Sequence, residues 1–200
     1  MRLWSVLFIS FFLIGCGQRI ANLDSRGVNI ICFGNSITQG QGANPGHDYP
    51  ALLSQKLDLP VINAGVSGDT TRDALARVQK DVLEKNPRLV IVEFGGNDFL
   101  QGLPKEETLS NIERIVGLIQ QQGAIVVLAQ VRAGLWQDEY LAGFRRIARQ
   151  RKALLVPNIL GGILFNPDLK SDQIHPNDAG YALIAEKIYR AIKPLLEHHK

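Results

Sequence analysis

The chain has 200 residues, of which 46% are apolar and 20% are charged, and its formal charge at pH 7 is +3. This length and apolar content are enough to build the hydrophobic core of one globular domain. The sequence holds no basic run interleaved with aromatic residues, so it gives no reason to expect a nucleic-acid partner.

The first stretch of the chain is a candidate targeting segment. Arg2 precedes an apolar run from Leu3 to Ile14 that is too short to span a bilayer comfortably. We therefore interpret residues 1–15 as a signal peptide. Because the run ends in Leu13-Ile14-Gly15-Cys16, it resembles the lipobox of bacterial lipoproteins, in which the cysteine is lipidated and becomes the first mature residue. An ordinary signal peptide and an uncleaved anchor are the alternatives.

The other boundaries follow from composition. Residues 16–27 are interpreted as a polar linker, residues 28–196 as the folded domain and residues 197–200 as a polar tail. A lipidated Cys16 would hold the domain on a membrane of the bacterial cell envelope, at a periplasmic or extracytoplasmic face. The second cysteine, Cys32, lies in an apolar run, so we expect a buried and unreactive thiol.

Short apolar runs alternate with longer amphipathic segments along the domain. Five continuous apolar runs predict buried strands, and apolar residues at helical spacing predict helices. In chain order we expect strand Val28–Phe33, helix Tyr49–Leu57, strand Val61–Asn63, helix Thr71–Lys85, strand Leu89–Phe94, a helix from Leu109 to Ile119, strand Ala124–Gln130, helix Tyr140–Arg151, strand Ala153–Val156 and helix Asn177–Leu196. This alternation predicts an α/β fold with a parallel sheet of about five strands and helices on both faces.

Polar or glycine-containing segments follow the first three predicted strands. They are Gly34-Asn35-Ser36, Asn63 to Gly68 and Gly95 to Asp98. Ligands of parallel sheets bind outside the carboxyl ends of the strands, so we expect the three segments to meet at one edge. The long loop from Pro157 to Ser171 is the candidate wall or lid of a site there.

Ser36 and His175 are a candidate nucleophile and base. His175 is preceded three residues earlier by Asp172, so one local turn could let the carboxylate hold Nδ1–H while Nε2 faces outward. Asn177 is a candidate N-cap of the helix that follows. The alternatives for Asp172 and His175 are a surface Asx turn and a pair of metal ligands, for which no third ligand lies nearby in sequence.

Three further residues have the chemistry of an acyl-transfer site. Gly68 and Asn97 offer a backbone N–H and a side-chain amide for the negative charge that develops on a carbonyl oxygen, although each also suits an ordinary turn. Glu93 lies in an apolar strand, where an unpaired carboxylate is costly. It is either a second catalytic acid or, as we favour, a hydrogen-bonded structural carboxylate.

Four blocks together resemble those of the SGNH hydrolases, also called GDSL esterases. They run from Phe33 to Thr38, from Asn63 to Thr71, from Gly95 to Asp98 and from Asp172 to Pro176. The stretch from Val61 to Thr71 is similar to the bacterial arylesterase and acyl-CoA thioesterase/lysophospholipase branch. The resemblance spans the chain from Asn29 to Leu196.

The resemblance implies a flavodoxin-like three-layer fold and a role for each motif residue. Ser36 would be the nucleophile, His175 the general base and Asp172 its orienting acid. The N–H groups of Ser36 and Gly68 and the Asn97 side-chain amide would form the oxyanion hole. No cofactor or metal is implied.

One position departs from the family pattern. Where the first block usually has Asp, this chain has Asn35. An amide can hydrogen-bond locally but carries no charge, which leaves open how the Ser36 loop is supported and how the site responds to pH.

The predicted function is hydrolysis of small acyl esters or thioesters through an acyl-enzyme. Two alternatives stay open: a carbohydrate O-deacetylase that uses the same groups, and a lipoprotein that binds an acyl ligand without turnover. The length of the pocket depends on the loops Val131 to Tyr140, with Trp136, and Gly161 to Lys170, with Phe165.

Overall fold

The structure is a computed structural model that describes residues 19–132 and 138–197. The predicted signal peptide, Cys16 and Trp136 lie outside these residues. Within the two described ranges, no helix is long and apolar enough to cross a membrane.

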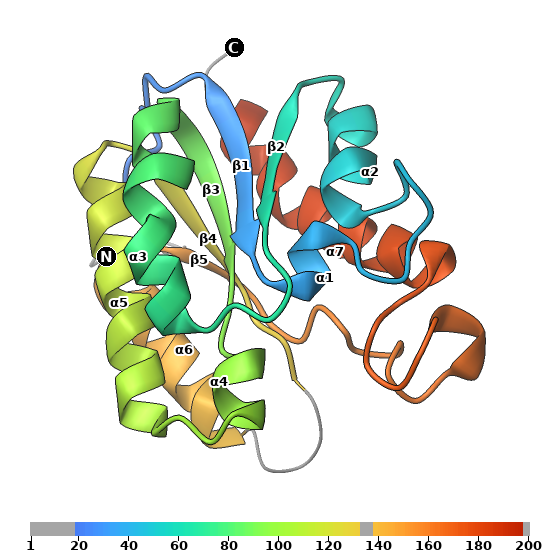
Figure 1. Ribbon diagram of the computed structural model, residues 1–200. Coiled ribbons are helices and arrows are strands. Elements are labelled where there is room, and N and C mark those ends of the chain that lie inside the picture. Colours follow the sequence, from blue (N-terminus) through green and yellow to red (C-terminus); the bar gives the residue numbers. More distant parts are fainter. Residues whose placement is uncertain (1–18, 133–137, 198–200) are drawn as a thin grey trace, which may run out of the picture.

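Five parallel strands form one sheet in the order β2-β1-β3-β4-β5, which confirms the predicted α/β fold (Figure 1). The chain order reverses between the neighbours β1 and β3, and such a switch point is where open parallel sheets bind their ligands. The strands are β1 (Asn29–Gly34), β2 (Val61–Gly65), β3 (Pro87–Glu93), β4 (Ile125–Ala129) and β5 (Leu154–Val156).

Helices cover both faces of the sheet, giving three layers (Figure 1). On one face lie α3 (Thr71–Asp81), α5 (Lys105–Gln121) and α6 (Asp138–Arg151), and on the other lie α2 (Tyr49–Leu57) and α7 (Asp178–Glu197). Because side chains alternate along a strand, Phe33 packs in the first layer and its neighbour Cys32 in the second. The central strands β1, β3 and β4 are therefore buried on both sides, as their continuous apolar runs predict. The prediction of a fully buried strand is wrong for β2 and β5, which lie at the two edges of the sheet and are only partly buried.

The helices differ from the prediction mainly at their ends and in three short additional elements. The segment predicted as one helix from Thr71 to Lys85 is α3 followed by a separate 3-10 turn, η1 (Leu83–Lys85). Asn177 caps α7, since its Oδ1 accepts a hydrogen bond of 3.1 Å from the Gly180 N–H. Two short helices, α1 (Ser36–Gln39) and α4 (Gly96–Leu100), and the 3-10 turn η3 (Pro167–Leu169) were not predicted, because so few residues show no helical period.

Candidate active site

Ser36 is the first residue of α1, directly beyond the carboxyl end of β1. A Cβ on Gly34 would come within 2.0 Å of Thr38 Oγ1 and 2.8 Å of Glu93 Oε2, so the close packing at this strand end requires glycine. Asn35 then caps α1, because its Oδ1 accepts a hydrogen bond of 3.0 Å from the Ile37 N–H. The turn leaves the Ser36 side chain at the sheet edge, where the residue is 8% exposed.

Ser36, His175 and Asp172 form a continuous hydrogen-bonded array. His175 Nε2 lies 3.1 Å from Ser36 Oγ, and His175 Nδ1 lies 2.7 Å from Asp172 Oδ2. The other carboxylate oxygen, Oδ1, accepts the backbone N–H groups of Ile174 at 2.9 Å and His175 at 2.8 Å. These bonds, the backbone one from His175 foremost, lower the pKa of Asp172 to about 2. The acid is therefore ionised at neutral pH and fixes the imidazole with Nε2 toward the serine.

Each of the three expected oxyanion donors has an N–H hydrogen available to bond an oxyanion. Asn97 Nδ2 donates one hydrogen to the Asp69 carbonyl oxygen at 2.9 Å, and an amide nitrogen carries a second. Among the described residues, no acceptor takes the backbone N–H of Ser36 or of Gly68. Gly68 has a φ of 87° and lies on the loop next to the cavity described below, without lining it.

Arg77, on α3, was not predicted as part of the site, yet it bonds three of the segments that surround the site. The guanidinium donates to the carbonyl oxygens of Gly34 and Ala64, at 2.9 Å each, and to Asp69 Oδ2 at 2.6 Å. It also stacks over the Phe33 ring, 4.5 Å from the centroid. Arg77 thus joins the ends of β1 and β2 to the loop that carries Gly68. In sequence it looks like any charge on a helix, so no signal identifies it.

Asp98 anchors α4, the short helix that also carries Asn97. It is fully buried and accepts hydrogen bonds from the N–H of Thr71, at 3.0 Å, and from its hydroxyl, at 2.5 Å. Because Thr71 begins α3, Asp98 fixes α4 against that helix. The sequence placed Asp98 in a motif but did not predict this contact.

Glu93 is the last residue of β3 and is fully buried. Its Oε2 accepts the Thr38 hydroxyl at 3.0 Å and the Asn35 N–H at 3.3 Å. These contacts agree with the hydrogen-bonded structural carboxylate that we favoured from the sequence.

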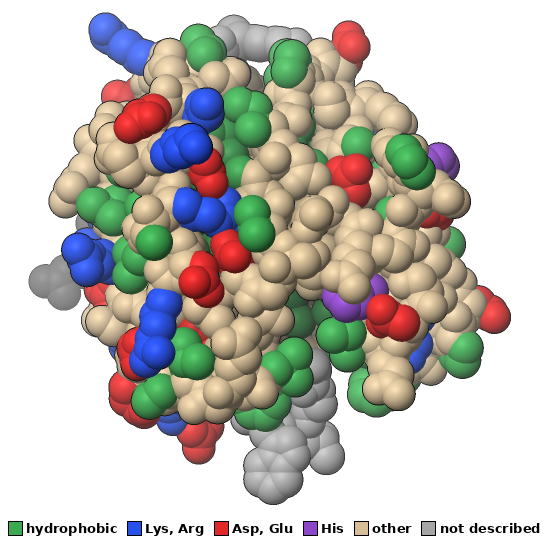
Figure 2. Space-filling model, viewed as in Figure 1, with side chains coloured by type: hydrophobic (Ala, Val, Ile, Leu, Met, Phe, Trp, Pro, Cys, Tyr) green, Lys and Arg blue, Asp and Glu red, His purple; other side chains and the backbone are tan. Residues whose placement is uncertain are grey.

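A cavity of about 160 Å³ opens at this edge beside Ser36. Its polar lining includes Ser36, Glu93, Asn97 and His175, and its apolar lining is Ile37, Phe99, Leu100, Val131, Leu160, Leu164 and Ile174. Figure 2 shows a hollow with a histidine side chain at its edge and hydrophobic side chains around it. The site therefore combines a few polar groups with a mostly apolar wall, as ligand pockets commonly do.

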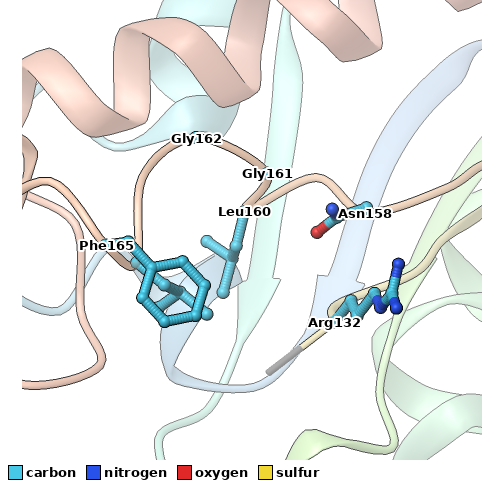
Figure 3. Close-up of a pocket in the computed structure, with 7 residues that line it drawn as sticks. Arg132, Asn158, Leu160, Gly161, Gly162 and Phe165 are labelled. Carbon is cyan, nitrogen blue, oxygen red and sulfur yellow. The ribbon is translucent and has the colours of Figure 1, made fainter. Parts of the chain in front are cut away.

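A second cavity, of about 200 Å³, lies beyond Leu160 and Leu164, which line both (Figure 3). In Figure 3, Phe165 and Leu160 lie on one side of it, across from Arg132 and Asn158. These residues show that the loop from Pro157 to Ser171 forms a wall of the site, as predicted. The distal cavity offers room for a substrate longer than the first cavity holds.

Cys32 is fully buried, and burial raises the pKa of its thiol far above the ordinary value, so it stays protonated and unreactive. In the described part of the chain, no group of three or more His, Cys, Asp or Glu side chains is placed to hold a metal ion. Both carboxylate oxygens of Asp172 instead accept hydrogen bonds from residues of its own turn.

Comparison with known proteins gives the family. Residues 32–183 match the GDSL-like Lipase/Acylhydrolase family. The chain is 32% identical over 178 residues to esterase TesA of Pseudomonas aeruginosa, covering 84% of this chain and 89% of that protein. It is 28% identical over 203 residues to thioesterase 1/protease 1/lysophospholipase L1 of Escherichia coli, covering 98% and 95%. The crystal structure of TesA superposes with a TM-score of 0.77 at 30% identity, over 84% of this chain and 99% of that one.

The matched range contains all four motif blocks, and the fold and the cavity agree with it. The chain therefore belongs to the GDSL-like lipase/acylhydrolase family, the SGNH hydrolases, and is a hydrolase of carboxylic esters or thioesters.

Proposed function

We propose that Ser36 is the nucleophile of this hydrolase, His175 its general base and Asp172 the acid that orients the imidazole. The observation that carries the proposal is the array itself, with 3.1 Å between Ser36 Oγ and His175 Nε2 and 2.7 Å between His175 Nδ1 and Asp172. Serine hydroxyls are weak nucleophiles at neutral pH and need such a base within hydrogen-bond reach.

The reaction has two halves. Ser36 Oγ attacks the acyl carbon while His175 Nε2 takes its proton, and the carbonyl oxygen becomes an oxyanion. When the bond to the leaving oxygen or sulfur breaks, His175 gives that proton to the leaving group, and the acyl group stays on Ser36. Water then attacks the acyl-enzyme, His175 accepts a proton from it, and the proton returns to Ser36 Oγ as the free acid leaves.

The oxyanion would be held by the N–H groups of Ser36 and Gly68 and by the second amide hydrogen of Asn97. Donors aimed in advance at a developing charge are worth more in a cavity screened from water than in solution. The bond from Asn97 to the Asp69 carbonyl oxygen fixes the amide plane before the substrate binds.

The size of the catalytic cavity favours a short acyl group. Its volume is about 160 Å³, and Leu160 and Leu164 lie between it and the distal cavity. We propose small acyl esters or thioesters as substrates, with longer chains reaching the distal cavity only past Leu164. Rates on p-nitrophenyl acetate, butyrate, hexanoate and octanoate test this. The wild type should prefer the shorter chains, and Leu164→Ala should shift the preference toward octanoate. An octanoate preference in the wild type would contradict the proposal.

Covalent labelling tests the nucleophile. A fluorophosphonate should modify Ser36 and no other serine, read by mass spectrometry of the digested full chain. Ser171 is an exposed serine that donates to the carbonyl oxygens of His175 and Pro176. It is the internal control because no histidine ring nitrogen among the described residues bonds its hydroxyl. An unmodified Ser36 in folded protein would overturn the assignment.

We also propose that Cys16 carries a lipid anchor, on the strength of the lipobox-like sequence before it. The first described residues lie at the end of the sheet where the strands begin. There the Ala21 N–H donates to the Lys152 carbonyl oxygen at 2.8 Å, and the Val28 N–H donates to the Asn86 carbonyl oxygen at 3.0 Å. Lys152 and Asn86 precede strands, whereas Ser36 follows one, so the tether and the cavity would lie at opposite edges (Figure 1).

An anchored enzyme would therefore open toward water and meet substrates from the aqueous phase. Expression of the full chain in a bacterial host with radiolabelled palmitate tests the anchor. The wild type should be labelled and sediment with membranes, and Cys16→Ser should be unlabelled and soluble, with the same esterase kcat. An unlabelled, soluble wild type would exclude the anchor and leave the hydrolase assignment standing.

A further inference from the structure

Glu93 lies at the centre of a buried polar network beneath the nucleophile. Its Oε2 holds both sides of the turn around Ser36, accepting the Asn35 N–H and the Thr38 hydroxyl. Since Thr38 donates to Glu93, the hydroxyl of Tyr49, 2.8 Å away, donates to Thr38 Oγ1. Glu93, Thr38 and Tyr49 are all fully buried. The chain of bonds fixes where α1 begins and hence where Ser36 stands.

Within residues 19–132 and 138–197, no lysine, arginine or histidine forms an ion pair with this carboxyl. The titratable groups near the Glu93 carboxyl are Tyr49 from α2 and Tyr181 from α7. Cys32 from β1 interacts with Tyr49, and His175 lines the same cavity as Glu93. The tyrosines and the thiol are neutral at pH 7, and burial raises the pKa of Glu93 to about 8. The carboxyl is therefore largely protonated at neutral pH.

The position of the proton follows from the hydrogen bonds. Oε2 already accepts two of them, while Oε1 is buried and has no partner among the described residues. The proton therefore belongs on Oε1, and Glu93 is one of the residues that line the catalytic cavity. An ionised Glu93 would instead place negative charge near the developing oxyanion, where it opposes the reaction.

We propose that Glu93 is a positioning residue for Ser36 that works as a neutral carboxylic acid, holding the Asn35–Thr38 turn without placing a charge beneath the oxyanion. The inference rests on the proposed role of Ser36. It also gives Asn35 a part, because its backbone N–H donates to Glu93 Oε2 while its side chain caps α1. An Asp at this position would set a second carboxyl against the first.

The test is the pH dependence of kcat for the full chain, with acid release from a butyrate ester followed by pH-stat titration. Wild-type kcat should fall to half of its plateau near pH 8. Glu93→Gln keeps a neutral acceptor and a donor, so it should retain kcat within about threefold at pH 7 and lose this basic limb. Glu93→Ala leaves the Asn35 N–H and the Thr38 hydroxyl without their acceptor and should lower kcat about 10- to 100-fold, with little change in KM.

Two more variants separate this role from a merely structural one. Asn35→Asp should move the basic limb to higher pH, because a neighbouring carboxylate makes Glu93 harder to ionise. Asp98→Asn removes another fully buried carboxyl and should leave the limb where it is, whatever its effect on the rate. The proposal would be overturned if Glu93→Gln kept the basic limb of the wild-type kcat profile. It would also be overturned if a folded Glu93→Gln lost as much kcat as Glu93→Ala. An active Ser36→Ala would instead refute the proposed nucleophile, so the two failures are distinct.

Discussion

His175 Nε2 lies 3.1 Å from Ser36 Oγ although 139 positions separate the two residues. Ser36 is held by the end of β1, and His175 by a turn before α7 in which the Ser171 N–H donates to the His175 carbonyl oxygen at 3.0 Å. The base and the nucleophile are thus positioned by different elements. Their alignment depends on the contacts that hold each one, and these contacts can be tested separately.

Asp172→Asn should lower kcat by about 10²- to 10⁴-fold, because an amide at this position no longer selects the imidazole tautomer with Nε2 free to accept a proton. The side chain of Asp172 is 48% exposed, so the fold should tolerate the change. Steady-state kinetics and the melting temperature measure the two effects. An equal kcat for variant and wild type would remove Asp172 from the site.

Asn97→Ala should lower kcat by about 10²- to 10³-fold with a small change in KM, because it removes a donor that acts mainly on the transition state. The matched control is Gln101→Ala. Gln101 also donates to the loop, to the Gly68 carbonyl oxygen at 3.3 Å, but it does not line the cavity. If both variants lose the same activity, Asn97 acts only by holding the loop.

Arg77→Ala should destabilise the fold by about 3 kcal/mol, because it leaves the largely buried Asp69 carboxylate without its cation and removes one donor each from the carbonyl oxygens of Gly34 and Ala64. Urea unfolding measures the loss. Arg72 lies on the same helix as Arg77, and Arg72→Ala, which breaks its exposed ion pair with Glu107 of α5, should change stability little. Equal effects from the two variants would show that Arg77 does not join the site's edges.

The stability of the wild type should fall as pH rises from about 4.5 to about 8. In the folded state the pKa of Glu93 is raised from 4.5 to about 8, so its contribution is complete below pH 4.5 and is lost as pH rises through 8. The slope has an upper limit of about 1.4 kcal/mol per pH unit. Melting temperatures across this range should fall less steeply for Glu93→Gln. Parallel curves for the two proteins would place the Glu93 pKa elsewhere.

The parts of the fold and of the candidate site that could be predicted from the sequence are those fixed by residues close together in the chain. The predicted strands follow apolar runs, and all five begin and end within two residues of the observed strands, β2 running on through Ala64 and Gly65. Asp172 and His175 could be assigned to one turn because they are three residues apart, and Ser36 because a glycine turn ends its strand.

The parts that could not be predicted depend on contacts between distant segments. Arg77 joins β1 to β2, and Glu93 bonds Asn35 and Thr38 only because β3 lies beside β1 with Gly34 opposite Glu93. The distal cavity depends on how the loop after β5 packs near Arg132. No periodicity or motif carries such information, so only the structure explains how a chain with Asn35 supports its nucleophile.

Turnover by Ser36→Ala is the most direct measurement of the central claim. The variant removes one oxygen from a nearly buried side chain and should keep the melting temperature of the wild type within a few degrees. Its kcat on p-nitrophenyl butyrate should fall by at least about 10³-fold, since no acyl-enzyme can form. A folded Ser36→Ala protein that hydrolyses the ester at the wild-type rate would contradict the account.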